Sequence, residues 1–187
     1  AIAAELVSSS AALTYVVGAW RPPLGIALRA DGLSGAMLVM TALVVVAVGL
    51  FAHVQYGLRE GGDGERERTT FWLMLLALWS ALNMVFVGED LFNLYVALEL
   101  LTFAAVPLVC LDGRTETVNA ALRYLLFALL GSLLYLLGVG LIYGQYGTLD
   151  LLALSRLSRS DPALSVALAL MIVGLLAKAA LFPLHLW

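Results

Sequence analysis

Residues 33–52 read Leu-Ser-Gly-Ala-Met-Leu-Val-Met-Thr-Ala-Leu-Val-Val-Val-Ala-Val-Gly-Leu-Phe-Ala, which is twenty residues without a charge. An α-helix needs about 20 apolar residues to cross the hydrocarbon core of a bilayer, because each residue advances it by about 1.5 Å. This stretch is therefore predicted to be a transmembrane helix. The composition of the whole chain agrees, since 63% of its 187 residues are apolar and 12% are charged. We expect a polytopic membrane protein of the all-α class.

Other apolar stretches extend this pattern along the chain. They predict a single membrane domain with about five full spans, at residues 33–56, 70–88, 91–111, 118–143 and 163–187, and one partial span at residues 1–17. Because Ala1 opens the chain without a methionine, a basic segment or a cleavage site, we expect the chain to be a piece of a longer protein.

The connections between the spans are polar. Residues 59–68 read Arg-Glu-Gly-Gly-Asp-Gly-Glu-Arg-Glu-Arg, and this glycine-rich, densely charged composition predicts a solvated loop. Residues 148–158 hold five leucines with one aspartate and one arginine. Either a short amphipathic helix at the membrane surface or an ordinary surface loop fits that composition.

Smaller patterns give local expectations. Gly140 and Gly144 form a Gly-x-x-x-Gly pattern, which favours close helix packing. Glu89 and Asp90 precede a span and are expected to cap its N-terminus, where the helix dipole favours negative charge. Arg123 lies near the start of its span, where it serves either as a headgroup anchor or as an access point for protons.

Charge and cysteine content exclude several classes of function. The net charge of −3, without a basic cluster, argues against a nucleic-acid partner. Cys110 is the one cysteine, so it has no internal disulfide partner, and we expect it to fill apolar space. The sequence holds no phosphate loop, nucleophile triad or metal cluster.

Glu99 is the one carboxylate well inside an apolar run, residues 91–111. It lies eight residues after Leu91, about 12 Å along a helix, so we expect it near the middle of the membrane. Tyr95 and Thr102, at i−4 and i+3, fall on the same helix face and are candidate proton-relay residues. The alternative is a neutral, buried carboxyl group that only hydrogen-bonds to a neighbouring helix.

Lys178 is the only lysine in the chain, and it stands inside the apolar run 163–187. An ammonium group in the middle of a membrane helix costs about 2.5 to 3.5 kcal/mol, so such a group is usually functional. The alternative is a lysine that reaches back to the membrane surface. Pro183 interrupts the helix after Lys178, as in the discontinuous helices that line transporter cavities. His185 beyond it is either a proton relay or an interfacial residue.

The two buried charges make physical sense as a pair. At 4 Å and an effective dielectric constant near 20, their attraction is about 4 kcal/mol, which offsets much of the insertion cost. Separating them would disfavour both charged forms. We therefore expect Glu99 and Lys178 to exchange protonation states and to form the catalytic pair of a proton path.

Several stretches resemble the antiporter-like subunits of respiratory complex I and the Mrp-type cation/proton antiporters. Residues 88–99 (Gly-Glu-Asp-Leu-Phe-Asn-Leu-Tyr-Val-Ala-Leu-Glu) and 174–187 (Gly-Leu-Leu-Ala-Lys-Ala-Ala-Leu-Phe-Pro-Leu-His-Leu-Trp) carry most of the likeness. Residues 20–34 look like the loop that leads into that family's third helix, and residues 120–124 with Gly131-Ser132 look like its sixth. The resemblance covers nearly the whole chain, and subunits of membrane hydrogenases have similar sequences in these stretches.

The resemblance implies a fold of about fourteen helices, built from two inverted repeats of about five helices with discontinuous seventh and twelfth helices. This chain would match the end of the second helix through the seventh. Glu99 would be the fifth-helix glutamate and Lys178 the seventh-helix lysine, while the segment 59–68 would lie in the cytoplasm. The eighth and twelfth helices, beyond Trp187, would supply the remaining channel groups.

The resulting expectation is proton translocation, with or without Na⁺ coupling, by a subunit of a membrane complex in a bacterial or archaeal plasma membrane. Its partners would be other membrane subunits and the lipid bilayer. Redox chemistry would belong to other subunits, so no flavin, iron-sulfur or haem cofactor is expected on this chain. The alternative is a structural membrane subunit in which Glu99 and Lys178 only fix helix packing. A membrane enzyme acting on lipid or quinone is disfavoured, because it would need clustered His, Asp or Cys residues.

Overall fold

The computed structural model describes residues 12–20, 25–57, 62–157, 161–179 and 181. Within these ranges the long elements are all helices: α2 (Gly32–Gly57), α3 (Gly62–Val87), α4 (Leu91–Val109), α5 (Thr115–Tyr146) and α7 (Pro162–Lys178). A short helix, α6 (Leu151–Leu157), lies between α5 and α7, and the 3₁₀ turn η2 (Cys110–Asp112) lies between α4 and α5. A second 3₁₀ turn, η1 (Val17–Ala19), precedes α2. Two strands, β1 (Leu13–Val16) and β2 (Ala27–Ala30), form an antiparallel pair.

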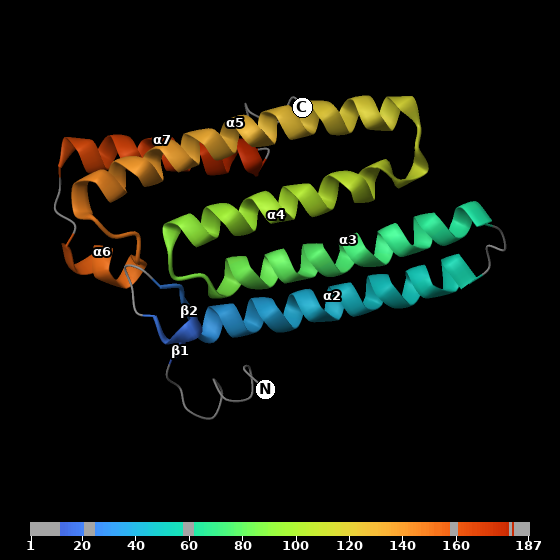
Figure 1. Ribbon diagram of the computed structural model, residues 1–187, viewed down its shortest axis with the longest axis horizontal. Coiled ribbons are helices and arrows are strands. Elements are labelled where there is room, and N and C mark those ends of the chain that lie inside the picture. The colour runs from blue at the N-terminus through green and yellow to red at the C-terminus, as the bar shows by residue number, and fades with distance from the viewer. Residues whose placement is uncertain (1–11, 21–24, 58–61, 158–160, 180, 182–187) are drawn as a thin grey trace.

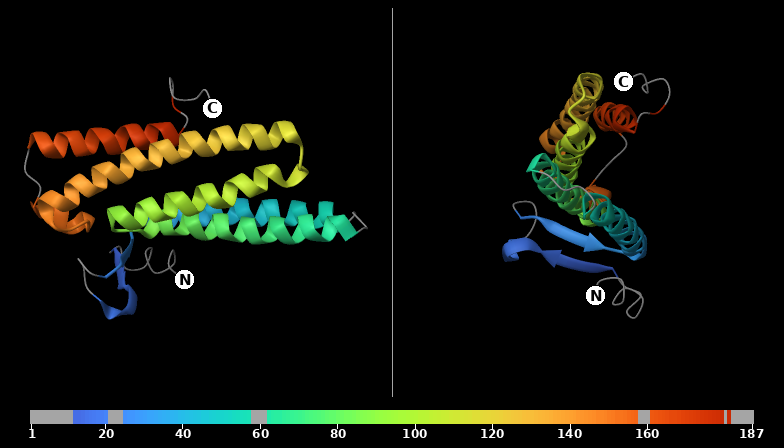
Figure 2. Two further views of the ribbon diagram at one scale, coloured as in Figure 1. Left: turned by 45° about the horizontal axis from the view of Figure 1, so that its top comes forward. Right: turned by 90° about the vertical axis from the view of Figure 1, so that its right-hand side faces the viewer.

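The long helices lie side by side, and consecutive ones run in opposite directions (Figure 1). α5 packs most extensively against α7, α4 lies between α3 and α5, and α2 packs against α3 (Figures 1 and 2). Glu99 on α4 and Lys178 on α7 thus belong to elements that both flank α5. The β1–β2 pair and α6 lie at one end of the bundle (Figure 1).

Four helices in the described part of the chain are long and apolar enough to cross a membrane: Gly32–Tyr56, Gly64–Val87, Leu91–Asp112 and Thr115–Tyr146. Their outer surfaces are rich in exposed leucine, valine and phenylalanine, as expected for helices that face lipid. The predicted helical membrane bundle is therefore observed. α7, the fifth apolar helix, is shorter, with 17 residues or about 26 Å.

Three expected boundaries were wrong. The partial helix over residues 1–17 does not extend to its predicted end, because Leu13–Val16 pairs as a strand with Ala27–Ala30. The fold is therefore mainly helical with one short strand pair, rather than all-α as predicted. Thr14, Tyr15 and Val16 are residue types that favour strands. Residues 1–11 lie outside the described part of the chain.

The predicted loop over residues 59–68 is the second correction, because α3 already begins at Gly62. Glutamate and arginine are good helix formers, so a charged, solvated segment can still be helical. The third correction concerns the last span, because α7 already ends at Lys178, before Pro183, where the interruption was expected. Residues 180 and 182–187 lie outside the described part of the chain. The segment 148–158, for which two alternatives were open, contains the short helix α6.

The end of the bundle that carries α6 is held by backbone and side-chain hydrogen bonds. Asp90 caps α4 by accepting hydrogen bonds from the amides of Phe92 (2.8 Å) and Asn93 (3.0 Å), as predicted. Glu89 does not cap the helix. Instead its buried carboxylate pairs with the guanidinium group of Arg29 on β2 at 3.3 Å.

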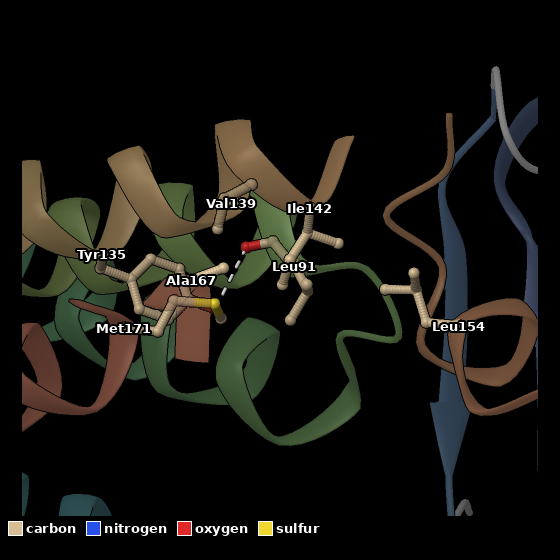
Figure 3. Packing of buried hydrophobic residues seen from close by; sticks show 7 residues of the cluster. All are labelled: Leu91, Tyr135, Val139, Ile142, Leu154, Ala167 and Met171. Carbon is tan, nitrogen blue, oxygen red and sulfur yellow. Dashed lines mark hydrogen bonds between the residues drawn. The ribbon is translucent and has the colours of Figure 1, made fainter. Parts of the chain in front are cut away.

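Buried apolar side chains gather where α4, α5, α6 and α7 meet: Leu91, Tyr135, Val139, Ile142, Leu154, Ala167 and Met171 (Figure 3). The hydroxyl group of Tyr135 donates a hydrogen bond to the carbonyl oxygen of Leu91 at 3.3 Å, which is the dashed line in Figure 3. This bond satisfies a polar group that burial would otherwise leave unpaired. The cluster fixes α4 and α7 against α5.

Candidate functional site

The ammonium group of Lys178 and the carboxylate of Glu99 form an ion pair across two helices. Lys178 Nζ donates a hydrogen bond to Glu99 Oε1 at 3.0 Å, and each side chain is 12% exposed. At this separation and an effective dielectric constant near 20, the attraction is about 5 kcal/mol. That is comparable with the cost of placing the two charges in the membrane, so each charge stabilises the other.

The positions of the two charges follow from their helices. Glu99 is the ninth of 19 residues in α4, which places it at mid-helix. Lys178 is the last residue of α7, where the chain leaves the helix at Ala179. The C-terminal end of a helix carries partial negative charge, which favours an ammonium group there. The termination of α7 at Lys178 therefore helps to stabilise the ammonium group at the site.

Further polar atoms surround the ammonium group. Lys178 Nζ also donates to the hydroxyl oxygen of Thr102 at 3.2 Å and to the carbonyl oxygen of Leu98 at 3.3 Å. Thr102 is buried, and its hydroxyl group donates in turn to the Leu98 carbonyl at 3.1 Å. The three donor positions of the ammonium group therefore have acceptors, all of them on α4.

Ser132 on α5 is a site residue that sequence reasoning missed. Its hydroxyl group donates a hydrogen bond to Glu99 Oε1, and the residue is buried. Serine is common in membrane helices, where it often bonds to the carbonyl one turn earlier, so the residue type alone carried no signal. Its contact with Glu99 spans 33 positions of sequence and depends on how α4 packs against α5.

Close contact between α5 and α7 brings Lys178 to the site. A Cβ atom added to Gly131 would lie 2.8 Å from the carbonyl oxygen of Gly174, and one added to Gly138 would lie 2.5 Å from that of Ala167. Glycine is therefore required at both positions for this approach. Gly140 and Gly144 make no such approach within the described part of the chain, because a Cβ atom at either position would meet no described atom within 4 Å.

The remaining candidates lie elsewhere. Tyr95 packs beside the apolar cluster and contacts the ring of Phe92, and among the described residues it makes no hydrogen bond with the ion pair. Arg123 is exposed on α5, nine residues or about 14 Å along the helix from Ser132. His185 lies outside the described residues. Thr102 is thus the predicted relay candidate that the structure brings to the pair.

This arrangement has the chemistry of a proton-exchange site. An acid and a base are in direct contact, and buried hydroxyl groups that can both donate and accept hydrogen bonds lie on either side of them. No group of three or more His, Cys, Asp or Glu residues that could hold a metal ion occurs in the described ranges. The expectation that this chain carries no cofactor stays a prediction.

Comparison with known proteins places the chain in a family. Residues 88–187, which include both charges, match the family model described as NADH:quinone oxidoreductase/Mrp antiporter, TM. The chain is 42% identical over 177 residues to NADH-quinone oxidoreductase subunit N of Desulforudis audaxviator strain MP104C, covering 92% of this chain and 34% of that protein. It is 32% identical over 189 residues to a Na⁺/H⁺ antiporter subunit of Bacillus subtilis strain 168, covering 100% of this chain and 37% of that protein.

The solved structures agree with the sequence comparison. A chain of the membrane-bound sulfane sulfur reductase, an archaeal respiratory membrane complex, superposes with a TM-score of 0.86 at 27% identity, covering 100% of this chain and 37% of that one. The present chain thus spans about a third of the length of the curated relatives that it matches. Its apolar helices, its fold and its sequence together establish that it is an integral membrane protein of the NADH:quinone oxidoreductase/Mrp antiporter transmembrane family.

Proposed function

We propose that this chain is part of an antiporter-like subunit that moves protons across a plasma membrane, with Glu99 and Lys178 as the residues that exchange them. The observation that carries the proposal is the 3.0 Å contact between two nearly buried, oppositely charged side chains on different helices. Such a pair holds both charges while it is closed. When it opens in a dry environment, the carboxylate tends to gain a proton and the ammonium group to lose one, so helix movement drives proton transfer.

Protons, rather than Na⁺, are the ions proposed to act at this pair. The ammonium group of Lys178 lies 3.0 Å from the Glu99 carboxylate and repels a second cation at that site. The name of the Bacillus subtilis relative includes Na⁺. Coupling to Na⁺, if the complex has it, is proposed to use groups outside the described residues.

The partners are proposed to be other membrane subunits of one complex, because the solved relative is part of a respiratory membrane complex. The exposed apolar surfaces of the helices would face those subunits and lipid. Electron transfer in such a complex is proposed to take place on other subunits.

The test uses everted membrane vesicles from cells that carry the full-length subunit in its native complex. Glu99→Gln and Lys178→Ala are each expected to reduce proton transport at least tenfold, while native gel electrophoresis shows a normal amount of assembled complex. Glu116→Gln is the matched control, because Glu116 lies on the exposed first turn of α5 and the charge change is the same. It should transport protons at the normal rate.

The competing proposal is a structural role for the ion pair, which its position between two helices also favours. In that case both variants would lower the amount of assembled complex, and the remaining complex would transport protons at the normal rate per molecule. Proton transport divided by the amount of complex therefore separates the two functions.

A further inference from the structure

Two donors converge on a single oxygen atom of Glu99. Lys178 Nζ from α7 and the Ser132 hydroxyl group from α5 both donate to Oε1. Within the described part of the chain, no hydrogen bond reaches the second oxygen, Oε2. The carboxylate is thus held at one oxygen, and the other is left available for a proton.

The hydroxyl group of Ser132 has one proton and two acceptors. Besides Glu99 Oε1, it has the carbonyl oxygen of Ala128 at 2.9 Å, one turn earlier on α5. One proton serves one of these acceptors at a time. A hydrogen bond to a charged carboxylate is about twice as strong as one to a neutral acceptor, so the charge on Glu99 decides which acceptor the hydroxyl group serves.

We propose that Ser132 is a positioning residue that orients the Glu99 carboxylate and stabilises its charged form, so that an arriving proton binds at Oε2. This inference rests on the proposed function of the pair. When a proton forms an O–H bond with Oε2, Glu99 becomes neutral, and the Ser132 hydroxyl group turns to the Ala128 carbonyl without losing its own proton.

The surroundings of Glu99 leave few other groups that could control its charge. On α7 the facing charge is Lys178, and α3 has no titratable residue between positions 70 and 87. On α5 the nearest titratable residue is Tyr135, whose hydroxyl group is occupied by a backbone carbonyl. On α4 itself it is Tyr95, which makes no hydrogen bond to the pair among the described residues. The effect of a change at Ser132 on Glu99 is therefore little disturbed by other titratable groups among the described residues.

The test measures proton transport as a function of pH in everted vesicles that contain the full-length subunit in its complex. Removing the donor in Ser132→Ala should shift the acidic limb of the pH profile upward by about half a pH unit or more, because the carboxylate then gains a proton more easily. Ser132→Thr keeps the hydroxyl group and should keep the normal profile. Ser165→Ala is the matched control, because the Ser165 hydroxyl group is exposed on α7 and bonds to the carbonyl oxygen of Asp161.

A Ser132→Ala variant with the normal pH profile, even at a reduced rate, would show that Ser132 only packs, and it would overturn the inference. Ser132→Cys serves if the alanine variant does not assemble, because its thiol is a weak donor and should shift the profile in the same direction. Glu99→Gln separates a failure of the proposed function from a failure of the role proposed for Ser132. Normal transport by that variant contradicts the proposed function itself, whereas its loss together with an unshifted Ser132→Ala profile contradicts only the role of Ser132.

Discussion

At Thr102, one buried hydroxyl group serves two neighbours. It accepts a hydrogen bond from Lys178 Nζ and donates one to the Leu98 carbonyl. Thr102→Val keeps the shape of the side chain and removes the acceptor. Proton transport should fall roughly fivefold, equivalent to about 1 kcal/mol, because the ammonium group loses one of its three acceptors.

The measurement is proton transport per assembled complex in vesicles. Thr69→Val is the control, because the Thr69 hydroxyl group is exposed and bonds to the carbonyl oxygen of Glu65. Equal rates for both variants and the unaltered complex would mean that Thr102 does not take part in holding Lys178.

Asp31 gives a pH-dependent prediction at the start of α2. Hydrogen bonds from the backbone amide and then the hydroxyl group of Ser34 hold the pKa of Asp31 below its ordinary value. The charged form therefore stabilises the first turn. This stabilisation is complete above the pKa of the unfolded chain and is lost as the pH falls through the lower, folded pKa.

Hydrogen exchange of the Ser34 and Gly35 amides, corrected for intrinsic rates, should therefore show protection that decreases at acidic pH. Asp31→Asn keeps a capping side chain that does not titrate, so its protection should be independent of pH. Protection that decreases equally in both proteins would assign the effect to another group.

At the scale of helices, the distance between α5 and α7 is set by three glycines, Gly131, Gly138 and Gly174. Gly131→Ala would place a methyl group 2.8 Å from the Gly174 carbonyl, so α7 must move away and carry Lys178 with it. We expect a destabilisation of about 1 to 3 kcal/mol and a loss of proton transport. Gly140→Ala is the control on the same helix, because a Cβ atom there meets no described atom within 4 Å.

Thermal unfolding of the purified complex measures the difference. Gly140→Ala should leave the midpoint unchanged or raise it slightly, since alanine favours a helix over glycine by about 0.5 to 1 kcal/mol. If Gly131→Ala behaves in the same way, the close approach of α5 and α7 is not what holds the site together.

The sequence pattern predicted these helices to different degrees. The length of the apolar run was enough for α2, α4 and α5, because a membrane requires a minimum number of apolar residues. The start of α3 was not predictable from polarity, because residues 62–68 are charged yet helical. The end of α7 was missed because apolar composition continues past Lys178 while the helix does not.

The candidate site was predicted only in part, because some of its contacts join helices that are far apart in the sequence. Glu99 and Lys178 were conspicuous because charge is rare in apolar runs, and Thr102 followed from helical spacing on α4. Ser132 and the glycines Gly131 and Gly174 act across helices that are far apart in the sequence. The resemblance included Gly131, Ser132 and Gly174, but the residues that they contact became apparent only from the packing of α5 against α4 and α7.

At the scale of the whole molecule, two ion pairs among the described residues join elements that are far apart in the sequence. Glu99 and Lys178 pair inside the bundle, whereas Arg29 and Glu89 pair at one end and link the β1–β2 strands to the connection between α3 and α4. Two backbone hydrogen bonds, from Leu91 to Leu149 at 3.1 Å and from Leu151 to Glu89 at 2.9 Å, join the same connection to the segment before α6. This end is therefore a structural unit.

Arg29→Gln tests that assignment, because it leaves the buried carboxylate of Glu89 without its cation. Arg29 is 41% exposed, so water screens the pair, and we expect a loss of about 1 to 2 kcal/mol with proton transport per complex unchanged. The double variant Arg29→Gln with Glu89→Gln should recover part of that stability, since no unpaired charge remains. Arg114→Gln, which disrupts an exposed pair with Asp112 at 3.7 Å, should have almost no effect. A loss of transport per complex in Arg29→Gln would instead connect this end of the bundle to the proton path.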